Sequence, residues 1–345
     1  MTEIQSLLEV INSGRRLVVF LHDNPDPDAI AAGWLLGEIA RHVGVRYRIV
    51  YGGHVRRAEN RTMIQQLKPP IQSLDDPKKP MRFLRTDRNA LVDTQPQVGN
   101  NAFPGDRLAC HVVIDHHPTA SEIQSTFADI RPQQGSCTTM ILNYYRSLSL
   151  IPPTNLATAA AYAIISETQD LGREATRQDR EALQFLLGYA SQTALGRIRH
   201  PTRPREYYRT IARAMQRVTI SRNTCICHIG LAYGPEAVAE VADFLVAMER
   251  VTWCLVSGFH QNKVFVSIRT THRRANAERV MKYVVHRKGK GGGHGMIAGG
   301  AVPCESLEKY PSIADLLTKR FVRKLRRRHA DPFRRLLDDN EFPCT

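Results

Sequence analysis

Residues 16–29 read RLVVFLHDNPDPDA, and this stretch predicts both a fold class and the place of a site. Its first half is a short apolar run rich in β-branched residues, which is typical of a buried strand. Its second half holds a histidine and acidic residues, and apolar residues then recur at helical spacing as far as His42. In open α/β folds, ligands bind at the carboxyl ends of the strands.

The alternation of strands and helices continues through the first half of the chain. Further strands are predicted at 46–51, 90–93 and 110–115, and helices at 58–67, 136–147 and 156–167. This order favours an α/β domain with a parallel sheet and helices on both of its faces.

The second half of the chain begins a new α/β pattern. Strands are predicted at 225–232, 252–259 and 263–270, helices at 206–217, 235–250, 276–286 and 312–328, and a glycine-rich loop at 289–300. The short turn between the last two strands indicates a hairpin, and therefore a mixed sheet. We expect a first domain at 1–190, a linker at 191–217, a second domain at 218–330 and a tail at 331–345.

Composition limits the class of protein. Of 345 residues, 42% are hydrophobic and 23% charged, as in soluble globular proteins. No apolar run is long enough to span a bilayer, and the N-terminus has no basic segment typical of a signal peptide. The seven scattered cysteines indicate reduced thiols, so we expect a cytoplasmic protein. The net charge of +15 indicates an anionic ligand, and by itself leaves nucleic acid, nucleotide and lipid open.

Three ligand-type motifs follow predicted strands. His22, Asp26 and Asp28 lie in the first, where close carboxylates would repel one another unless a divalent cation neutralised them. An acidic helix cap would account for only one of these aspartates. Asp93 is the third residue of the second motif, LVDT, and 113–118 (VIDHHP) is the third motif. Imidazole together with carboxylate suits manganese, iron, cobalt or zinc.

Two further motifs are less specific. Glu167 and Asp170 lie at the end of an apolar helical stretch, where a polar helix terminus is an equally good explanation. The run GKGGGHG at 289–295 contains His294 and follows a strand that carries Arg269. Glycine lets a backbone approach a ligand closely, so this run favours a phosphate site.

In this order and spacing, HDNPDPDA, LVDT, VIDHHP and GGGHGMIAGG resemble the motifs of the DHH/DHHA1 phosphoesterase family. The resemblance runs from about Arg16 to Gly300. The family includes RecJ-type exonucleases, oligoribonucleases that also dephosphorylate phosphoadenosine phosphate, and cyclic dinucleotide phosphodiesterases. The resemblance implies a parallel-sheet DHH catalytic domain, a smaller mixed-sheet DHHA1 substrate-binding domain and a cleft between them.

The resemblance also implies roles for individual residues. His22 and Asp26 match ligands of one metal ion, Asp28 matches a ligand of the other, and Asp93 matches the bridging aspartate. His116 matches a further metal ligand. His117 matches a histidine that contacts the substrate, and Asp115 would orient both histidines during catalysis. The substrate phosphate would be held by residues of the second domain: Arg269, Gly291, Gly292, Gly293 and His294.

The fourth motif departs from the family pattern. Many relatives have Asp-Thr-Gly where this chain has Glu167-Thr168-Gln169-Asp170. Glu167 aligns by position, whereas Asp170 lies one helical turn further on and has the shorter side chain of the relatives. Both are candidate metal ligands, and the shorter side chain favours Asp170.

The function implied is hydrolysis of phosphate esters in short oligonucleotides or nucleotides, with two divalent ions, manganese foremost. We expect no membrane partner and allow for a homodimer. One alternative is a phosphodiesterase for linear or cyclic dinucleotides, and another is an inactive nucleotide-binding regulator. A long-DNA exonuclease would need further domains, and the GGGH motif argues against a pyrophosphatase.

Overall fold

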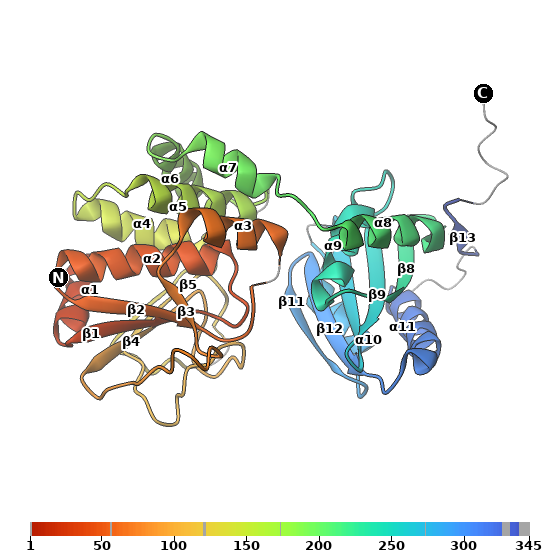
Figure 1. Cartoon of the computed structure of the whole chain (residues 1–345), viewed down its shortest axis with the longest axis horizontal. Helices are drawn as coiled ribbons and strands as arrows, with labels where there is room; N and C mark the ends of the chain where they lie inside the picture. The colour runs from red at the N-terminus through yellow and green to blue at the C-terminus, as the bar shows by residue number, and fades with distance from the viewer. Residues whose placement is uncertain are drawn as a thin grey trace. The chain divides into compact units, whose positions relative to one another are not determined.

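The computed structural model describes residues 2–55, 57–119, 122–172, 174–272, 274–325 and 332–337, except for the side chain of His294. The chain divides into two compact units, Met1–Thr202 and Arg203–Thr345 (Figure 1). The division falls inside the predicted linker 191–217. That segment is largely helical, with α7 (Gln192–Arg199) in the first unit and α8 (Arg205–Arg217) in the second.

The first unit contains the predicted parallel sheet. Its six strands are ordered β3-β2-β1-β4-β5-β6, and every neighbouring pair is parallel. The strands are β1 (Arg16–Phe20), β2 (Arg46–Tyr51), β3 (Ile71–Ser73), β4 (Asp87–Val92), β5 (Val112–Asp115) and β6 (Phe127–Ile130). Its other helices are α1 (Glu3–Asn12), α2 (Pro27–His42), α3 (Ala58–Leu67), α4 (Cys137–Ser147), α5 (Thr154–Glu167) and α6 (Arg177–Leu187).

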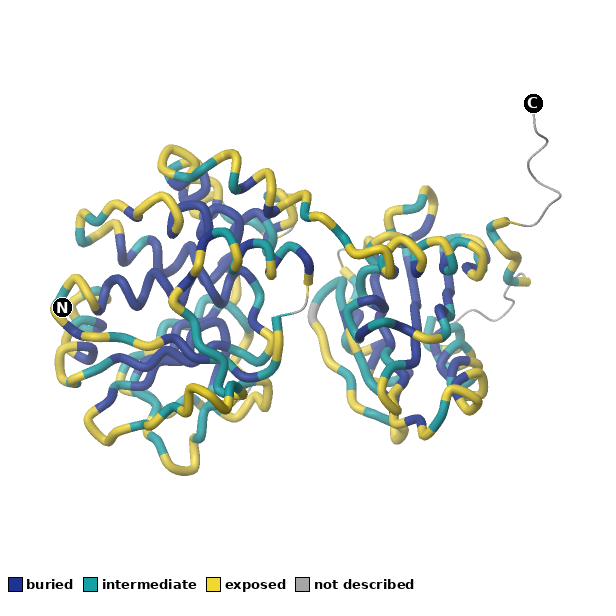
Figure 2. The backbone as a smooth tube through the Cα atoms, viewed as in Figure 1, coloured by how far each residue is buried: buried dark blue, intermediate teal, exposed yellow. Residues whose placement is uncertain are grey.

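The two faces of this sheet are covered differently. Leu17 and Val19 of β1 join the large core that includes residues of all seven helices of the first unit. Val18 and Phe20, which alternate with them, pack on the other face against apolar side chains from two loops. Those side chains are Leu74, Met81, Phe83, Phe103, Leu108 and Cys110. The prediction of helices on both faces is therefore wrong, because the proline-containing segments after β3 and β4 cover one face without helix. Figure 2 shows the buried strands beneath the helical layer.

The second unit has a mixed sheet, as predicted, and its seven strands lie in the order β11-β12-β10-β9-β8-β7-β13. Alternate residues of β9 face opposite cores: Trp253 and Leu255 pack with α10 and α11, whereas Cys254 and Val256 pack with α8 and α9. The strands are β7 (Thr219–Ser221), β8 (Thr224–Leu231), β9 (Trp253–His260), β10 (Lys263–Thr270), β11 (Lys290–His294), β12 (Ile297–Pro303) and β13 (Arg334–Arg335). The helices besides α8 are α9 (Pro235–Val246), α10 (Ala277–Val284), the 3-10 helix η1 (Leu307–Lys309) and α11 (Tyr310–Lys324).

The glycine-rich stretch 289–300, predicted as a loop, forms most of an antiparallel hairpin. Gly291 pairs with Gly300 and Gly292 with Gly299, and β11 is the edge strand of the sheet. Glycine has a low strand propensity, and a glycine-rich composition therefore indicated a loop. Hydrogen bonding to β12 stabilises the strand in spite of this composition. Within the described ranges, no helix has the length and apolarity needed to cross a membrane.

His228 on β8 predicts acid sensitivity of the second unit. Its ring nitrogens lie 2.7 Å from Ser257 Oγ and 2.9 Å from Thr318 Oγ1, and burial lowers its pKa from 6.5 to about 4. The unfolded chain therefore takes up a proton first, and the free energy of unfolding falls between pH 6.5 and pH 4, by up to roughly 3 kcal/mol. A His228→Gln variant should lack this component. The measurement is urea unfolding at pH 7 and 4.5, monitored by the fluorescence of Trp253 in proteins whose Trp34 is replaced by phenylalanine. An identical pH dependence of the unfolding free energy with His228 and with His228→Gln would contradict the prediction.

Candidate metal centre

The predicted ligands lie at the carboxyl-terminal ends of three neighbouring strands of the first sheet. The loop after β1 carries His22 and Asp26, the residue after β4 is Asp93, and β5 runs into His116. Since β1, β4 and β5 are adjacent and parallel, their carboxyl ends meet. The chain leaves β1 toward β2 on one side while β4 lies on the other, and this reversal of strand order is where α/β sheets bind ligands.

Asp93 lies at the centre of the cluster. Its backbone has φ 59°, a left-handed conformation that aspartate tolerates better than most residues, and its side chain is 2% exposed. Asp93 Oδ2 is 3.7 Å from His22 Nε2, while Oδ1 is 3.3 Å from His116 Nε2. Two groups of potential ligands therefore share Asp93. One is His22, Asp26 and Asp93, the other is Asp93, His116 and His117, and the ligand atoms within each group lie within 4.8 Å of one another.

Both histidines direct the same nitrogen at Asp93. His22 Nδ1 lies 2.9 Å from the carbonyl oxygen of Asp23, and His116 Nδ1 lies 3.1 Å from that of Gln134. A carbonyl oxygen only accepts, so each Nδ1 carries a hydrogen and donates it. The lone pair of each neutral ring is then on Nε2, the arrangement that orients histidine ligands in metal sites.

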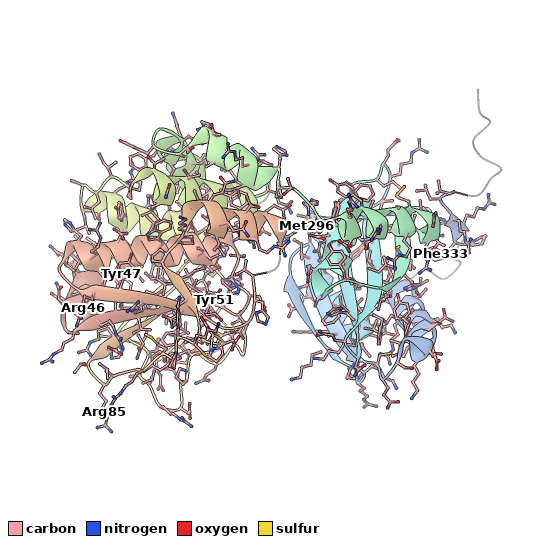
Figure 3. All side chains as sticks on the ribbon, viewed as in Figure 1. Arg46, Tyr47, Tyr51, Arg85, Met296 and Phe333 are labelled. Carbon is pink, nitrogen blue, oxygen red and sulfur yellow. The ribbon has the colours of Figure 1, made fainter. Side chains whose placement is uncertain are left out.

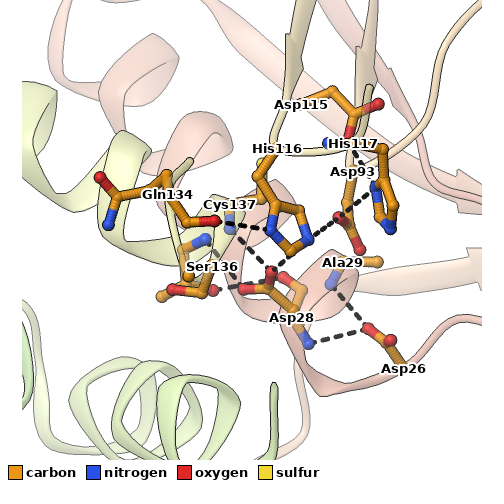
Figure 4. Close-up of polar contacts among 12 residues, drawn as sticks. Asp26, Asp28, Ala29, Asp93, Asp115, His116, His117, Gln134, Ser136 and Cys137 are labelled. Atoms are coloured by element: carbon orange, nitrogen blue, oxygen red, sulfur yellow. Dashed lines mark hydrogen bonds and ion pairs between the residues drawn. The ribbon is translucent and has the colours of Figure 1, made fainter. Parts of the chain in front are cut away.

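Asp28 is held by the N-terminus of α4. Its Oδ2 accepts a hydrogen bond from the Cys137 amide at 2.7 Å and its Oδ1 accepts one from the Thr138 amide at 2.9 Å (Figure 4). Asp28 Oδ2 also lies 3.8 Å from His116 Nε2. Each carboxylate oxygen has a second lone pair, so this anchoring fixes Asp28 without removing its capacity to bind a cation.

Asp179 supports this arrangement from behind. Its fully buried carboxylate accepts hydrogen bonds from Gln134 Nε2 at 2.8 Å, the Gly135 amide at 3.1 Å and Ser136 Oγ at 3.3 Å. Burial would raise the pKa of Asp179, but hydrogen bonds from Thr176, Thr139 and Gln134 lower it, so the group is an anion at neutral pH. The segment 134–136 thus holds both the carbonyl bonded to His116 and the start of α4.

Gln95 and Asp115 position His117. Asp115 Oδ1 accepts hydrogen bonds from His117 Nδ1 at 2.8 Å and from its amide at 3.1 Å, while Asp115 Oδ2 accepts one from Gln95 Nε2 at 2.8 Å. Gln95 Nε2 also lies 3.1 Å from the His117 carbonyl oxygen. The orienting role predicted for Asp115 thus agrees with its contact to His117, whereas His116 is oriented by Gln134. Gln95, Gln134 and Asp179 were not predicted from the sequence; of these, Asp179 alone has a local sequence signal, as part of a helix capping box with Thr176.

Replacing Gln95 by leucine should lower phosphoesterase turnover by about 10- to 100-fold, because Asp115 and His117 lose the donor that fixes their orientation. Gln95 is 2% exposed, so the unpaired Asp115 oxygen would lie in a buried place. The measurement is kcat and KM at saturating metal, beside Gln65→Leu, a control at an exposed position of α3. A Gln95→Leu protein with native kcat would show that Asp115 needs no such support.

The charge of the cluster fits a bound cation. Asp93 Oδ1 is buried and receives no hydrogen bond from the described residues. Burial, with repulsion from Asp93, raises the pKa of Asp28 to about 8. Burial would lower the pKa of His22, yet Asp26 and Asp93 raise it to about 10. In the metal-free protein, the protons retained by His22 and Asp28 partly neutralise the negative charge of the cluster. A bound divalent ion would neutralise this charge in their place and release those protons. The carboxylate and imidazole donors therefore fit a divalent transition-metal ion.

In the fourth motif, the structure does not support the choice of Asp170 over Glu167 as a metal ligand. The Asp170 side chain is 65% exposed and accepts a 2.7 Å hydrogen bond from Arg199. Glu167 is the residue of this motif that acts on the cluster, because its carboxylate raises the pKa of both Asp28 and His116. Asp170 follows the end of α5 in a left-handed conformation, so counting one further helical turn misplaced it. Glu167 remains the candidate ligand.

In the second unit, the predicted substrate residues have other partners. Arg269 is 8% exposed and donates to Asp243 Oδ1 at 2.5 Å and to Ser267 Oγ at 2.7 Å. Gly293 has φ 153°, and a Cβ there would lie 2.3 Å from the Ile297 carbonyl oxygen, so the strand pairing itself requires glycine. A Cβ on Gly292 would meet no atom within 4 Å. The phosphate-binding roles of Arg269 and Gly291–Gly293 stay predictions, and that of His294 concerns a side chain outside the described part of the chain.

Comparison with known proteins agrees with this geometry. The model of the DHH family, N-terminal domain, matches residues 16–164, and that of the DHHA1 domain matches residues 222–322. An uncharacterized protein of Methanocaldococcus jannaschii is 29% identical over 310 residues, which are 90% of this chain and 61% of that protein. The chain therefore spans about three-fifths of the length of this curated relative.

Solved structures share the fold. An exopolyphosphatase-related protein from Bacteroides fragilis has a TM-score of 0.76 at 13% identity, covering 94% of this chain and 97% of that one. RecJ from Thermus thermophilus in complex with Mn²⁺ has a TM-score of 0.54 at 14% identity, covering 93% of this chain and 54% of that one. With the model of the DHH family's N-terminal domain on the first unit and the DHHA1 model on the second, the chain carries a DHH domain followed by a DHHA1 domain.

Proposed function

We propose that this protein hydrolyses phosphate ester bonds of short oligonucleotides or nucleotides, using two divalent metal ions, manganese foremost, on either side of Asp93. The observation that carries the proposal is the sharing of one buried carboxylate by two groups of ligand side chains. RecJ, which has the same fold, has been crystallised with Mn²⁺ and with Mg²⁺. Bound divalent ions would lower the pKa of a coordinated water and polarise the phosphoryl oxygens.

The side chains around Asp93 have distinct tasks in this proposal. His22 and Asp26 would hold one ion and His116 and Asp28 would hold the other, while Glu167 would add negative charge near Asp28 and His116. His117 keeps its hydrogen on Nδ1 through the bond to Asp115, which leaves Nε2 to contact a phosphoryl oxygen when the ring is protonated. Asp93 directly follows β4 and Asp115 is the last residue of β5, and Asp115 is bonded to both His117 and Gln95, so these groups would need little rearrangement in the transition state.

Direct attack by water fits the side chains present. Cys137 is the thiol that the cluster carboxylates affect, but it is fully buried and donates to the Ile114 carbonyl oxygen at 3.3 Å. Burial and the neighbouring carboxylates raise its pKa well above the usual value, so it stays a thiol. The phosphorus–oxygen bond to the leaving group would therefore break as water adds, without a covalent enzyme intermediate.

The test is a substrate panel incubated with Mn²⁺. It contains a dinucleotide, a five-residue RNA, phosphoadenosine phosphate, a cyclic dinucleotide and pyrophosphate. The native chain is compared with Asp115→Ala/His116→Ala and with the chelated native protein. We expect turnover of the dinucleotide, short RNA or phosphoadenosine phosphate, lost in the double variant and on chelation.

Other outcomes would replace the proposal. Turnover of the cyclic dinucleotide alone would indicate a signalling phosphodiesterase. No turnover by a chain that demonstrably binds Mn²⁺ and a nucleotide would indicate a regulator that senses nucleotides.

A further inference from the structure

The positive charge of this chain is concentrated in one of its two units. Residues 203–345 contain 26 Lys and Arg against 13 Asp and Glu, whereas residues 1–202 contain 22 against 20. The second unit therefore carries +13 of the net charge of +15, and the unit with the metal centre carries only +2. A requirement for solubility alone does not explain so uneven a distribution, and a basic surface attracts polyanions.

Within the second unit, the charge gathers on the α10–α11 side of the sheet. Helix α10 with the following turn, 277–288, and helix α11, 310–324, hold eight basic residues and two acidic ones, Glu278 and Asp315. On the opposite side, α8 and α9 together hold four basic residues and four acidic ones, which include Glu236, Glu240 and Asp243 of α9. Glu278 is already paired with Lys282 at 2.6 Å. The α10–α11 side is therefore the more positive of the two.

Two contacts bring the basic ends of these helices together. Arg320 on α11 donates hydrogen bonds to the carbonyl oxygens of Val284 at 2.9 Å and His286 at 2.8 Å, at the C-terminus of α10. Lys324 lies over the ring of Tyr283, 5.0 Å from its centroid. These two cations are used within the unit. Arg287, Lys288, Lys319 and Arg323, which we call the basic face, are exposed and have no described side-chain partner.

We infer that the basic face binds the phosphodiester backbone of a single-stranded nucleic acid. This inference rests on the proposed function only for the choice of polyanion. Lys319 and Arg323 are one helical turn apart, and Arg287 and Lys288 follow the helix end that Arg320 holds against α11. A row of cations is suited to successive phosphates, since each neutralised phosphate releases counterions. Strands longer than the reacting residues would then bind the protein more tightly than a dinucleotide does.

An anionic membrane is the less suitable partner for this surface. Amphipathic helices that lie on membranes place large apolar side chains beside the basic ones. Among the described residues, α10 and α11 contribute none of the large apolar side chains that are exposed in this protein. Phosphate groups alone, held by charge, match the surface better.

The first experiment measures binding apart from hydrolysis. Fluorescence anisotropy of RNA and DNA strands about 20 nucleotides long, longer than one protein site, is followed with the full chain in EDTA over a range of salt concentrations. The variant neutralises the basic face: Arg287→Gln, Lys288→Gln, Lys319→Gln and Arg323→Gln. The matched control removes equal charge from exposed positions of the first unit: Arg46→Gln, Arg48→Gln, Lys78→Gln and Lys79→Gln. Figure 3 labels Arg46 on that unit.

We expect the basic-face variant to bind at least about tenfold more weakly and its salt dependence to flatten by roughly 3 in slope, while the control changes less than about twofold. Comparison of the affinities for RNA and DNA strands of the same sequence shows whether the protein distinguishes ribose from deoxyribose. The two pairs, Arg287→Gln/Lys288→Gln and Lys319→Gln/Arg323→Gln, should each give part of the loss, which guards against misfolding of the fourfold variant.

The inference would be overturned if the affinity for nucleic acid fell equally in the variant and the control, or fell in neither. It would also be overturned if binding of phosphatidylserine vesicles depended on the basic face while binding of nucleic acid did not. Hydrolysis of the short substrates in Mn²⁺ is measured in parallel and should be unchanged by the variant. A native chain without turnover would end the proposed function, and the binding result would still decide this inference.

Discussion

Replacing Asp93 by asparagine is expected to lower phosphoesterase activity by at least about a thousandfold, equivalent to roughly 4 kcal/mol of transition-state stabilisation. Asparagine has the same size, so the change removes charge rather than packing. It also places an amide between His22 Nε2 and His116 Nε2, where both groups of ligands share a carboxylate. Activity on the substrate panel and Mn²⁺ affinity by titration calorimetry are the measurements.

Stability distinguishes loss of the site from loss of the fold. Asparagine fills the same buried space, and loss of the repulsion that Asp93 exerts on Asp28 offsets loss of its attraction to His22 and His116, so the metal-free Asp93→Asn protein should unfold within a few degrees of the native one. Addition of Mn²⁺ should raise the unfolding temperature of the native protein and not that of the variant. The control is Asp170→Asn, at the exposed position paired with Arg199, which should keep activity within about threefold. An active Asp93→Asn protein with native metal affinity would refute the assignment of the centre.

Replacing Asp179 by alanine should have the largest effect on stability, about 3 kcal/mol in the free energy of unfolding of the first unit. The change leaves the Gln134 side chain and the Gly135 amide without their buried acceptor, and removes the capping box at Thr176. Because the 134–136 segment also supports His116 and the start of α4, Mn²⁺ affinity should fall by about 10- to 100-fold.

The protein has two tryptophans, one in each unit, which makes this measurement specific. With Trp253 replaced by phenylalanine, Trp34 on α2 reports the first unit alone, and urea unfolding gives its stability. Asp106→Ala, at an exposed residue that pairs only with its neighbour Arg107 among described contacts, is the control. Native Mn²⁺ affinity in a folded Asp179→Ala protein would mean that His116 and Asp28 are positioned without the buried network.

The gathering of the candidate metal ligands could be predicted from the sequence because each ligand motif follows a strong strand pattern. Three of the predicted strands, at 16–22, 90–93 and 110–115, are parallel neighbours in the sheet. Their carboxyl-terminal ends therefore lie together, and so do His22, Asp93 and His116. The family resemblance added which side chains belong together. Neither argument depends on the detailed packing of the unit.

What the sequence missed depends on contacts distant along the chain. Asp28 is bonded to amides 109 and 110 residues away, and no local pattern indicates that pairing. Asp170 was misplaced because a left-handed turn after α5 interrupts the helical spacing on which its position was estimated. The loops that replace helices on one sheet face have irregular apolar spacing, so no periodicity distinguished a covering loop from an exposed one.

The anchoring of Asp28 also has a consequence for how the centre matures during synthesis. A nascent chain that has emerged as far as residue 118 contains His22, Asp26, Asp28, Asp93, His116 and His117, yet lacks the amides of Cys137 and Thr138 and the carboxylate of Asp179. All of the candidate ligands except Glu167 would exist before the groups that orient them. The loop before α4 can form its hydrogen bonds to Asp179 only when the ribosome has extended the chain beyond α6, so a fragment that ends at residue 118 is expected to bind metal poorly.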